Sequence, residues 1–170
     1  MKTVALLLLL NGLLASGHNW QNNYDGPLNF KCPAGQSISS ITSEHHNKHE
    51  DRIWEFGCQT TYKQSTQCYW TGYINDFDQV ILFECPAHEV IAGMSSYHSN
   101  RHEDRRWRFY CCKNSWVSQS CHWTKYVNNF DQYFHWIVPS RNVLAGVHSY
   151  HQNRQEDRRW AYKVCVQYRK

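Results

Sequence analysis

The sequence predicts an all-β protein made of three repeats of 53 residues and stapled by disulfide bonds. Three observations carry this prediction. A Glu-Asp-Arg-x-Trp element occurs three times at a constant offset, polar and apolar residues alternate over short segments, and the cysteines follow the same offset. Turn-forming residues separate the alternating segments, and no long stretch has helical periodicity, which together are typical of strands.

The repeat is clearest at Asp51, Asp104 and Asp157, which are 53 residues apart and are each followed by Arg-x-Trp. Matching aromatic, proline, histidine and asparagine positions extend this register along the unit without a gap. Self-similarity at a fixed period indicates similar structural units. We therefore expect one packed body with pseudo-threefold symmetry, in a trefoil-like or related arrangement. We place the repeats at about residues 19–72, 73–125 and 126–170.

Each repeat contains segments that read as strands. Residues 29–32, 52–58 and 105–111 alternate between polar and apolar side chains, so that Trp, Phe and Cys share one face. The apolar run at 90–94 predicts a more buried strand.

The first 17 residues read as a secretory signal peptide. Lys2 precedes an apolar run at 4–10, and Ala15 and Gly17 are small residues at the −3 and −1 positions of a cleavage site. The apolar run is too short to span a bilayer, so we expect no membrane insertion. The mature chain would be 18–170, a secreted protein of the extracellular space or matrix, where disulfides form.

The cysteines are expected to form four disulfides that obey the repeat. Cys32 and Cys58 are 26 residues apart, as are Cys85 and Cys111, and the corresponding third-repeat positions are both valine. The remaining four form two pairs with a separation of 44 residues. The internal symmetry therefore selects one connectivity among the 105 that eight cysteines allow: Cys32–Cys58, Cys85–Cys111, Cys68–Cys112 and Cys121–Cys165.

Composition and motifs exclude several classes of function. The net charge of +4 is too small to argue for nucleic acid. No nucleophile elbow, His-Glu-x-x-His or phosphate loop occurs. Three near-equal copies of one element favour binding over the single asymmetric site of an enzyme. We expect no catalytic residues, no metal and no cofactor.

The repeated element has two interpretations. Its Asp, Arg and Trp side chains either satisfy backbone groups and fill a core, or recognise sugars and sulfate by bidentate hydrogen bonds and stacking. Three copies would then make a multivalent binder. The candidate ligand-binding residues are Asp51, Arg52, Trp54, Asp104, Arg105, Trp107, Asp157, Arg158 and Trp160.

Histidines and arginines recur beside this element. His45, His98 and His151 share one repeat position and are interpreted as polar residues lining a turn, with a metal or pH-sensitive contact as alternatives. Two basic clusters form either a solvated face balanced by neighbouring acids or a face for a sulfated glycan. They comprise Arg101, Arg105, Arg106, Arg108, Arg154, Arg158 and Arg159.

Several of these motifs resemble the dermatopontin family. They are the Asp-Arg-x-Trp-x-Phe/Tyr-x-Cys repeat, Phe-x-Cys-Pro at 83–86, Phe-Tyr-Cys-Cys at 109–112, and Cys-x-Trp at 68–70 and 121–123. Residues 96–107 are most similar to its hemagglutinin/amebocyte aggregation factor branch. The resemblance covers essentially the whole mature chain. It implies a secreted, disulfide-bonded, non-enzymatic protein of matrix or body fluid that binds matrix components and cells.

Two functions follow as expectations. The first is a multivalent adhesion or cell-aggregation protein that binds cell-surface or matrix glycans, including sulfated glycosaminoglycans and proteoglycans. The second is a structural matrix component that binds collagen or a proteoglycan core protein, without a sugar-specific site. A membrane-injuring toxin is a third, weaker reading, which no amphipathic or spanning segment supports.

Overall fold

The computed structural model describes residues 17–61 and 67–168, and these residues form strands and no helix. The all-β prediction is therefore confirmed. The predicted signal peptide at 1–17 lies almost entirely outside the described residues. The strands are β1 (Leu28–Lys31), β2 (Gln36–His46), β3 (Asp51–Thr60), β4 (Cys68–Trp70), β5 (Ile81–Glu84), β6 (Glu89–Ser99), β7 (Asp104–Lys113), β8 (Val117–Trp123), β9 (Phe134–Ile137), β10 (Asn142–Gln152) and β11 (Asp157–Gln167).

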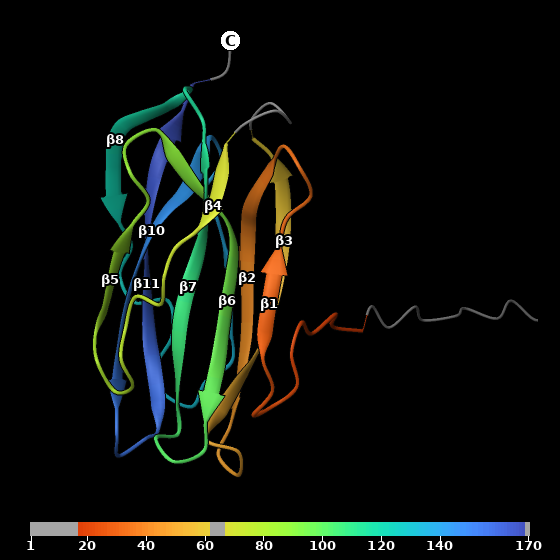
Figure 1. The fold of residues 1–170 in the computed structure, drawn as a ribbon, viewed down its shortest axis with the longest axis vertical. Helices are drawn as coiled ribbons and strands as arrows, with labels where there is room; N and C mark the ends of the chain where they lie inside the picture. The colour runs from red at the N-terminus through yellow and green to blue at the C-terminus, as the bar shows by residue number, and fades with distance from the viewer. Residues whose placement is uncertain (1–16, 62–66, 169–170) are drawn as a thin grey trace, which may run out of the picture.

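The strands form three curled antiparallel sheets, each built on one long hairpin (Figure 1). The orders are β1-β6-β7-β4, β5-β10-β11-β8 and β3-β2-β9. Each hairpin takes a short edge strand from another part of the chain: β6 pairs with β1, β10 with β5, and β2 with β9. The edge strands thus connect the three sheets in a closed cycle, because β9 from the C-terminal third joins the first hairpin.

The core lies between the sheets and is centred on three tryptophans. Trp54, Trp107 and Trp160 come from β3, β7 and β11, one from each sheet, and at most 1% of each residue is exposed. Every pair of these indoles is edge-to-face, with ring centroids 5.0–5.1 Å apart. This arrangement suits aromatic quadrupoles, so each ring contributes both buried area and a directed contact.

Two glycines allow the edge strands to approach the hairpins closely. Gly93 and Gly146 lie at bulges in β6 and β10, and a Cβ there would meet the carbonyl oxygens of Phe30 and Phe83 at 2.6 and 2.8 Å. A side chain at either position would therefore push β1 or β5 away from its sheet.

Four disulfides join neighbouring strands and segments. They are Cys32–Cys58, Cys68–Cys112, Cys85–Cys111 and Cys121–Cys165, the pairs expected from the sequence. Cys32–Cys58 joins the residue after β1 to β3, and Cys85–Cys111 joins the residue after β5 to β7. The other two disulfides lie across the strand pairs β4–β7 and β8–β11. Over 17–61 and 67–168 no helix is long and apolar enough to cross a membrane.

Candidate functional site

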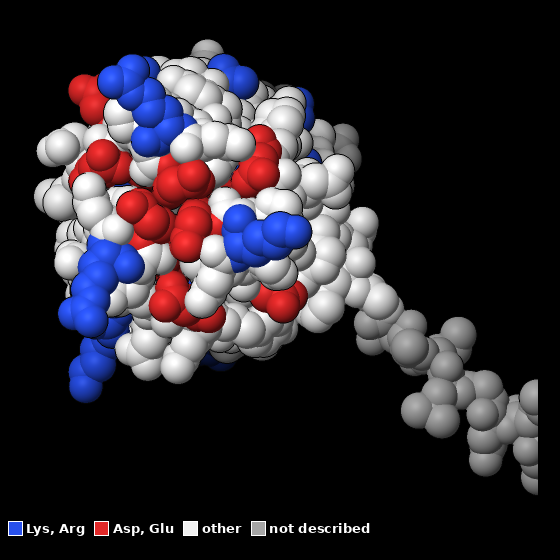
Figure 2. Space-filling view, turned by 90° about the horizontal axis from the view of Figure 1, so that it is seen from below, with Lys and Arg blue, Asp and Glu red and all other residues white. Residues whose placement is uncertain are grey.

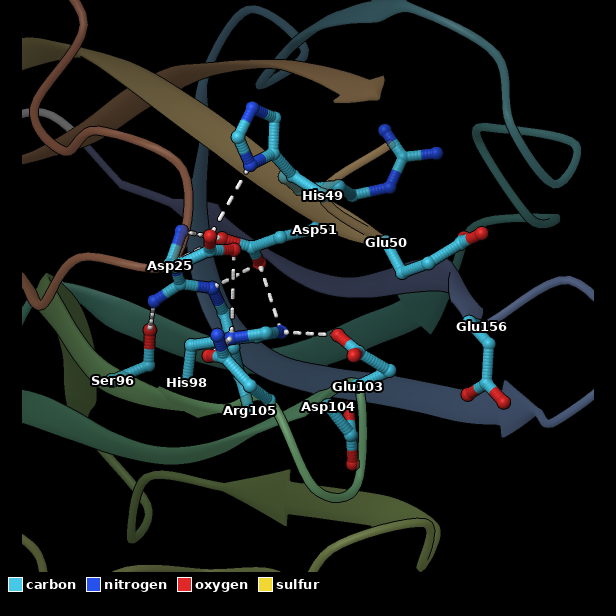
Figure 3. Close-up of polar contacts among 12 residues, drawn as sticks. Asp25, His49, Glu50, Asp51, Ser96, His98, Glu103, Asp104, Arg105 and Glu156 are labelled. Carbon is cyan, nitrogen blue, oxygen red and sulfur yellow. Dashed lines mark hydrogen bonds and ion pairs between the residues drawn. The ribbon is translucent and has the colours of Figure 1, made fainter. Parts of the chain in front are cut away.

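The arginines and aspartates of the repeated element pair with one another across the sheets. Arg105 of β7 donates from Nε and Nη2 to the two carboxylate oxygens of Asp51 of β3, both at 2.6 Å (Figure 3). Arg158 binds Asp104 with the same geometry and distances, and Arg52 binds Asp157 at 2.6 and 2.8 Å. Three bidentate pairs therefore join the three sheets in a second closed cycle. Their side chains are at most 4% exposed.

Further hydrogen bonds, mostly with backbone groups, satisfy the carboxylate and the guanidinium of each pair. Asp51 also accepts the N–H of Asp25 at 2.8 Å, and Arg105 donates to the carbonyl of Gly26 at 2.9 Å and to Ser96 Oγ at 3.2 Å. The carboxylate and the guanidinium thus have several hydrogen bonds each. A buried ion pair needs this because its desolvation is otherwise uncompensated.

An asparagine ties the preceding loop to each tryptophan strand. Asn75 donates to the carbonyl of Arg105 at 2.9 Å and accepts from the N–H of Trp107 at 2.9 Å. Asn22 and Asn128 make the same two contacts with β3 and β11. The loops are held at fixed positions against the sheets as a result.

The three repeat-position histidines are buried rather than exposed in turns. The side chains of His45 and His98 have no exposed surface, and that of His151 is 1% exposed. His98 lies between Glu103, 3.6 Å from Nε2, and Asp25, 3.7 Å from Nδ1. Asp51 lies 4.0 Å from Nε2 as well, so the ring of His98 is enclosed by carboxylates near the end of a strand, whereas the sequence predicted a residue lining a turn.

An acidic end forms where the three long hairpins turn, at the lower end of Figure 1. Glu50, Glu103 and Glu156 occupy these turns, each with a positive φ of 43–45°. Figure 2 looks onto this end and shows acidic side chains gathered at its centre, with lysine and arginine side chains around them. Burial, followed by nearby carboxylates, raises the pKa of Glu103 and Glu156 above the ordinary glutamate value.

Two groups at this end have the spacing of a cation site. Ligand atoms of Asp25, Asp51 and His98 lie within 4.8 Å of one another, and so do those of His45, Asp131 and Asp157. In each group, however, the buried aspartate already binds a guanidinium through both oxygens. A cation there would have to compete with the arginine that joins the sheets.

The nine sequence-predicted ligand-binding residues are thus brought together, but inside the protein. A small depression at the acidic end touches all nine of them together with the three turn glutamates. None of the three indoles presents a face to solvent, since they are at most 1% exposed. This placement favours the architectural interpretation of the element over stacking of a sugar on its tryptophans.

Aromatic and arginine side chains instead cover an outer face of the sheet β1-β6-β7-β4. We call this outer face 1, comprising Trp70, Tyr73, Tyr97, Arg106 and Arg108. Tyr73 is 42% exposed and meets Tyr97 edge-to-face at 5.0 Å. The guanidinium carbon of Arg108 lies 5.0 Å from the ring centroid of Trp70 and 5.7 Å from that of Tyr73.

The sheet β5-β10-β11-β8 carries a related surface, outer face 2, comprising Trp123, Tyr126, His148, Tyr150 and Arg159. The guanidinium carbon of Arg159 lies 4.8 Å from the ring centroid of Tyr126, which meets Tyr150 edge-to-face at 5.3 Å. A cleft lies here, and Lys125 contributes to its lining beside Trp123 and Tyr126.

Proximity along the chain places these arginines in the same two clusters and does not reveal this division. Arg105 and Arg158 are buried in ion pairs, whereas Arg106, Arg108 and Arg159 lie on the outer faces. The signal was the strand period of two, which places Arg106 and Arg108 on the face opposite Trp107.

Comparison with known proteins identifies the family. The family model for dermatopontin matches residues 22–168. The chain belongs to the dermatopontin family. It is 45% identical over 168 residues to the hemagglutinin/amebocyte aggregation factor of Limulus polyphemus, covering 97% of each chain. It is 41% identical over 140 residues to a dermatopontin of Biomphalaria glabrata, covering 82% of this chain and 94% of the relative.

A third relative is named a cytotoxin. Millepora cytotoxin-1 of Millepora dichotoma is 41% identical over 145 residues, which is 85% of this chain and 65% of the relative. No solved structure matches. The resemblance inferred from the sequence motifs is therefore confirmed at the level of the family.

Proposed function

We propose that this protein is a secreted, non-enzymatic adhesion protein that aggregates cells by binding glycans on cell surfaces or in the matrix. The observation that carries the proposal is the presence of aromatic and arginine side chains on two separate outer faces, on different sheets. A protein that joins two cells needs at least two binding surfaces, and two weak surfaces on one body gain avidity without new contacts.

The family supports the same role. One relative is named a hemagglutinin and amebocyte aggregation factor, and another a dermatopontin. A disulfide-rich fold also suits an oxidising compartment, in agreement with a signal peptide at 1–17 and secretion of 18–170.

We further propose that the three 53-residue repeats are equivalent structural units around a pseudo-threefold axis. The three ion pairs, the three tryptophans and the three loop asparagines recur at that interval, which supports this view. The Glu-Asp-Arg-x-Trp elements then serve the fold, and ligands bind on the outer faces.

A glycan array probed with the oxidised protein, run beside red-cell agglutination, tests the proposed function. We expect discrete saccharide hits and agglutination that the free saccharide inhibits. The alternative, a structural matrix component, predicts co-sedimentation with collagen fibrils, no array hit, and agglutination that no sugar affects.

A further inference from the structure

We propose that the chain carries two binding sites, and not three, for an anionic saccharide unit, one on each outer face. The unit is a pyranose ring bearing a sulfate or a carboxylate group. This inference rests on the proposed function and deepens it, because it names the chemistry of the ligand, its location and the valence of the protein.

The first site is organised around Arg108. Its Nε donates to Ser95 Oγ at 3.2 Å, and its guanidinium lies against the rings of Trp70 and Tyr73. Among the described residues no carboxylate pairs with Arg108. It is therefore a half-buried cation that is held in place by neutral groups, and its remaining N–H donors suit the two oxygens of an anionic group.

Tyr73 supplies the apolar half of this site. Its ring is exposed beside Arg108, at the centre of a row that continues to Tyr97 and Phe77. A pyranose presents an apolar face of C–H groups and a polar rim, so a flat exposed ring next to a guanidinium matches both parts of a charged sugar. Arg106 contributes less charge, because Asp76 lies 3.0 Å from its Nη2.

The second site uses the other arginine position. In outer face 2 the residue corresponding to Arg108 is the buried Ala161, and the cation is Arg159, which corresponds to Arg106. The position of Asp76 is taken by Asn129, a neutral amide 3.4 Å from Arg159 Nη2. Each outer face therefore has one arginine without an anionic partner among the described residues.

The surroundings of Arg159 add both charge and aromatic surface. Lys125 and His148 line the cleft with Trp123 and Tyr126, so Arg159 borders an open depression together with a second cation and two aromatic rings. Concave, largely aromatic sites with a few convergent polar groups are typical of small-ligand binding.

The corresponding positions of the first repeat carry an apolar and an acidic side chain in place of the arginines. Ile53 stands where the other faces have Arg106 and Arg159, and Glu55 stands where Arg108 does. The Trp20 ring is stacked on His18 with centroids 4.6 Å apart, and His18 also contacts Glu55 at 2.8 Å. An anionic sugar would meet the carboxylate of Glu55 there and neither of the two arginines, so this face provides no third site.

Isothermal titration of the oxidised full chain with two probes tests the inference. The probes are a sulfated glycosaminoglycan tetrasaccharide and a non-sulfated uronic-acid tetrasaccharide, which distinguish sulfate from carboxylate as the recognised group. The inference predicts two sites per chain for at least one probe. Arg108→Ala and Arg159→Ala are each expected to leave one site. The double variant should bind about tenfold or more weakly at both, since each site loses its charged hydrogen-bond donor.

A charge-matched control separates a site from general attraction. The exposed Arg101 and Arg154 lie in the hairpin turns. Arg101→Ala/Arg154→Ala therefore lowers the net charge by two, as Arg108→Ala/Arg159→Ala does. It should keep both sites, and thermal unfolding should show that every variant is folded. Tyr73→Ser and Tyr126→Ser should each weaken one site without changing net charge.

Three results would overturn the inference while the proposed function stands. One is saccharide binding that survives in the double arginine variant, and another is equal weakening in the control variant. A stoichiometry of three sites would also reject it. If the wild-type protein binds neither probe and no glycan on an array, the proposed function fails together with the inference.

Discussion

Removing Arg105 tests whether the three ion pairs hold the sheets together. Its guanidinium is 4% exposed and makes two 2.6 Å hydrogen bonds to Asp51, one to the carbonyl of Gly26 and one to Ser96. Arg105→Ala leaves a 3% exposed carboxylate whose one remaining hydrogen-bond donor among the described residues is the N–H of Asp25, with His98 4.0 Å away. Breaking a buried pair in this way costs about 3–5 kcal/mol. For a chain of this size the melting temperature should fall by roughly 6–20 °C.

The assay is denaturant unfolding of the oxidised protein, with thermal unfolding as a second readout. Arg106→Ala is the matched control, because the neighbouring arginine pairs with the largely exposed Asp76 and should lose less than about 1 kcal/mol. In a double-mutant cycle, Asp51→Ala combined with Arg105→Ala should lose clearly less than the two single losses added together. Equal, small losses for Arg105→Ala and Arg106→Ala would show that the buried ion pair does not hold the sheets together.

Three further predictions concern the core, the acidic end and the disulfides. Trp107→Ala should destabilise the fold by about 3–5 kcal/mol, measured by denaturant unfolding, since it removes one of three mutually packed indoles. The raised pKa values of Glu103 and Glu156 mean that the folded state binds protons more tightly than the unfolded chain, so stability is lost as pH rises through the folded pKa values. Glu103→Gln/Glu156→Gln should therefore raise the melting temperature at pH 7 and leave it nearly unchanged at pH 4; a lower melting temperature at pH 7 would contradict this. Cys85→Ser/Cys111→Ser should cost roughly 2–5 kcal/mol, and an unchanged unfolding midpoint would show that this bond does not constrain the chain.

The local features of the fold were predictable from the sequence because they depend on spacing along the chain. The alternating segment at 105–111 falls within β7, and the apolar run at 90–94 falls within β6, where it is buried. The disulfide pairs followed from two cysteine separations that repeat. Such patterns need no knowledge of how distant segments meet.

The pairing of distant segments was not predictable in the same way. The predicted repeat boundaries cut across the sheets: β1 lies in the first sequence repeat but pairs with β6 of the second. The partner of Arg105 is likewise 54 residues away, on another sheet. Whether an Arg-x-Trp element faces solvent or a neighbouring sheet depends on how strands from different repeats pair, and the periodicity of the sequence does not reveal this pairing.

The candidate binding surfaces were only partly predictable from the sequence, because they also depend on how distant segments meet. The basic clusters were recognised as a possible glycan face, but the buried Arg158 and the outer Arg159 are adjacent in sequence and have opposite roles. Their separation follows from the strand period, and the aromatic partner Tyr126 comes from a loop whose position the sequence does not fix.

Red-cell agglutination by single-site variants tests the proposed bivalence, because a monomer cross-links two cells only through two sites of its own. We expect the wild-type protein to agglutinate cells. Arg108→Ala and Arg159→Ala should each abolish agglutination while still binding saccharide, and Arg101→Ala/Arg154→Ala should behave like the wild type. Undiminished agglutination by both single variants would contradict a bivalent adhesion protein with these two sites.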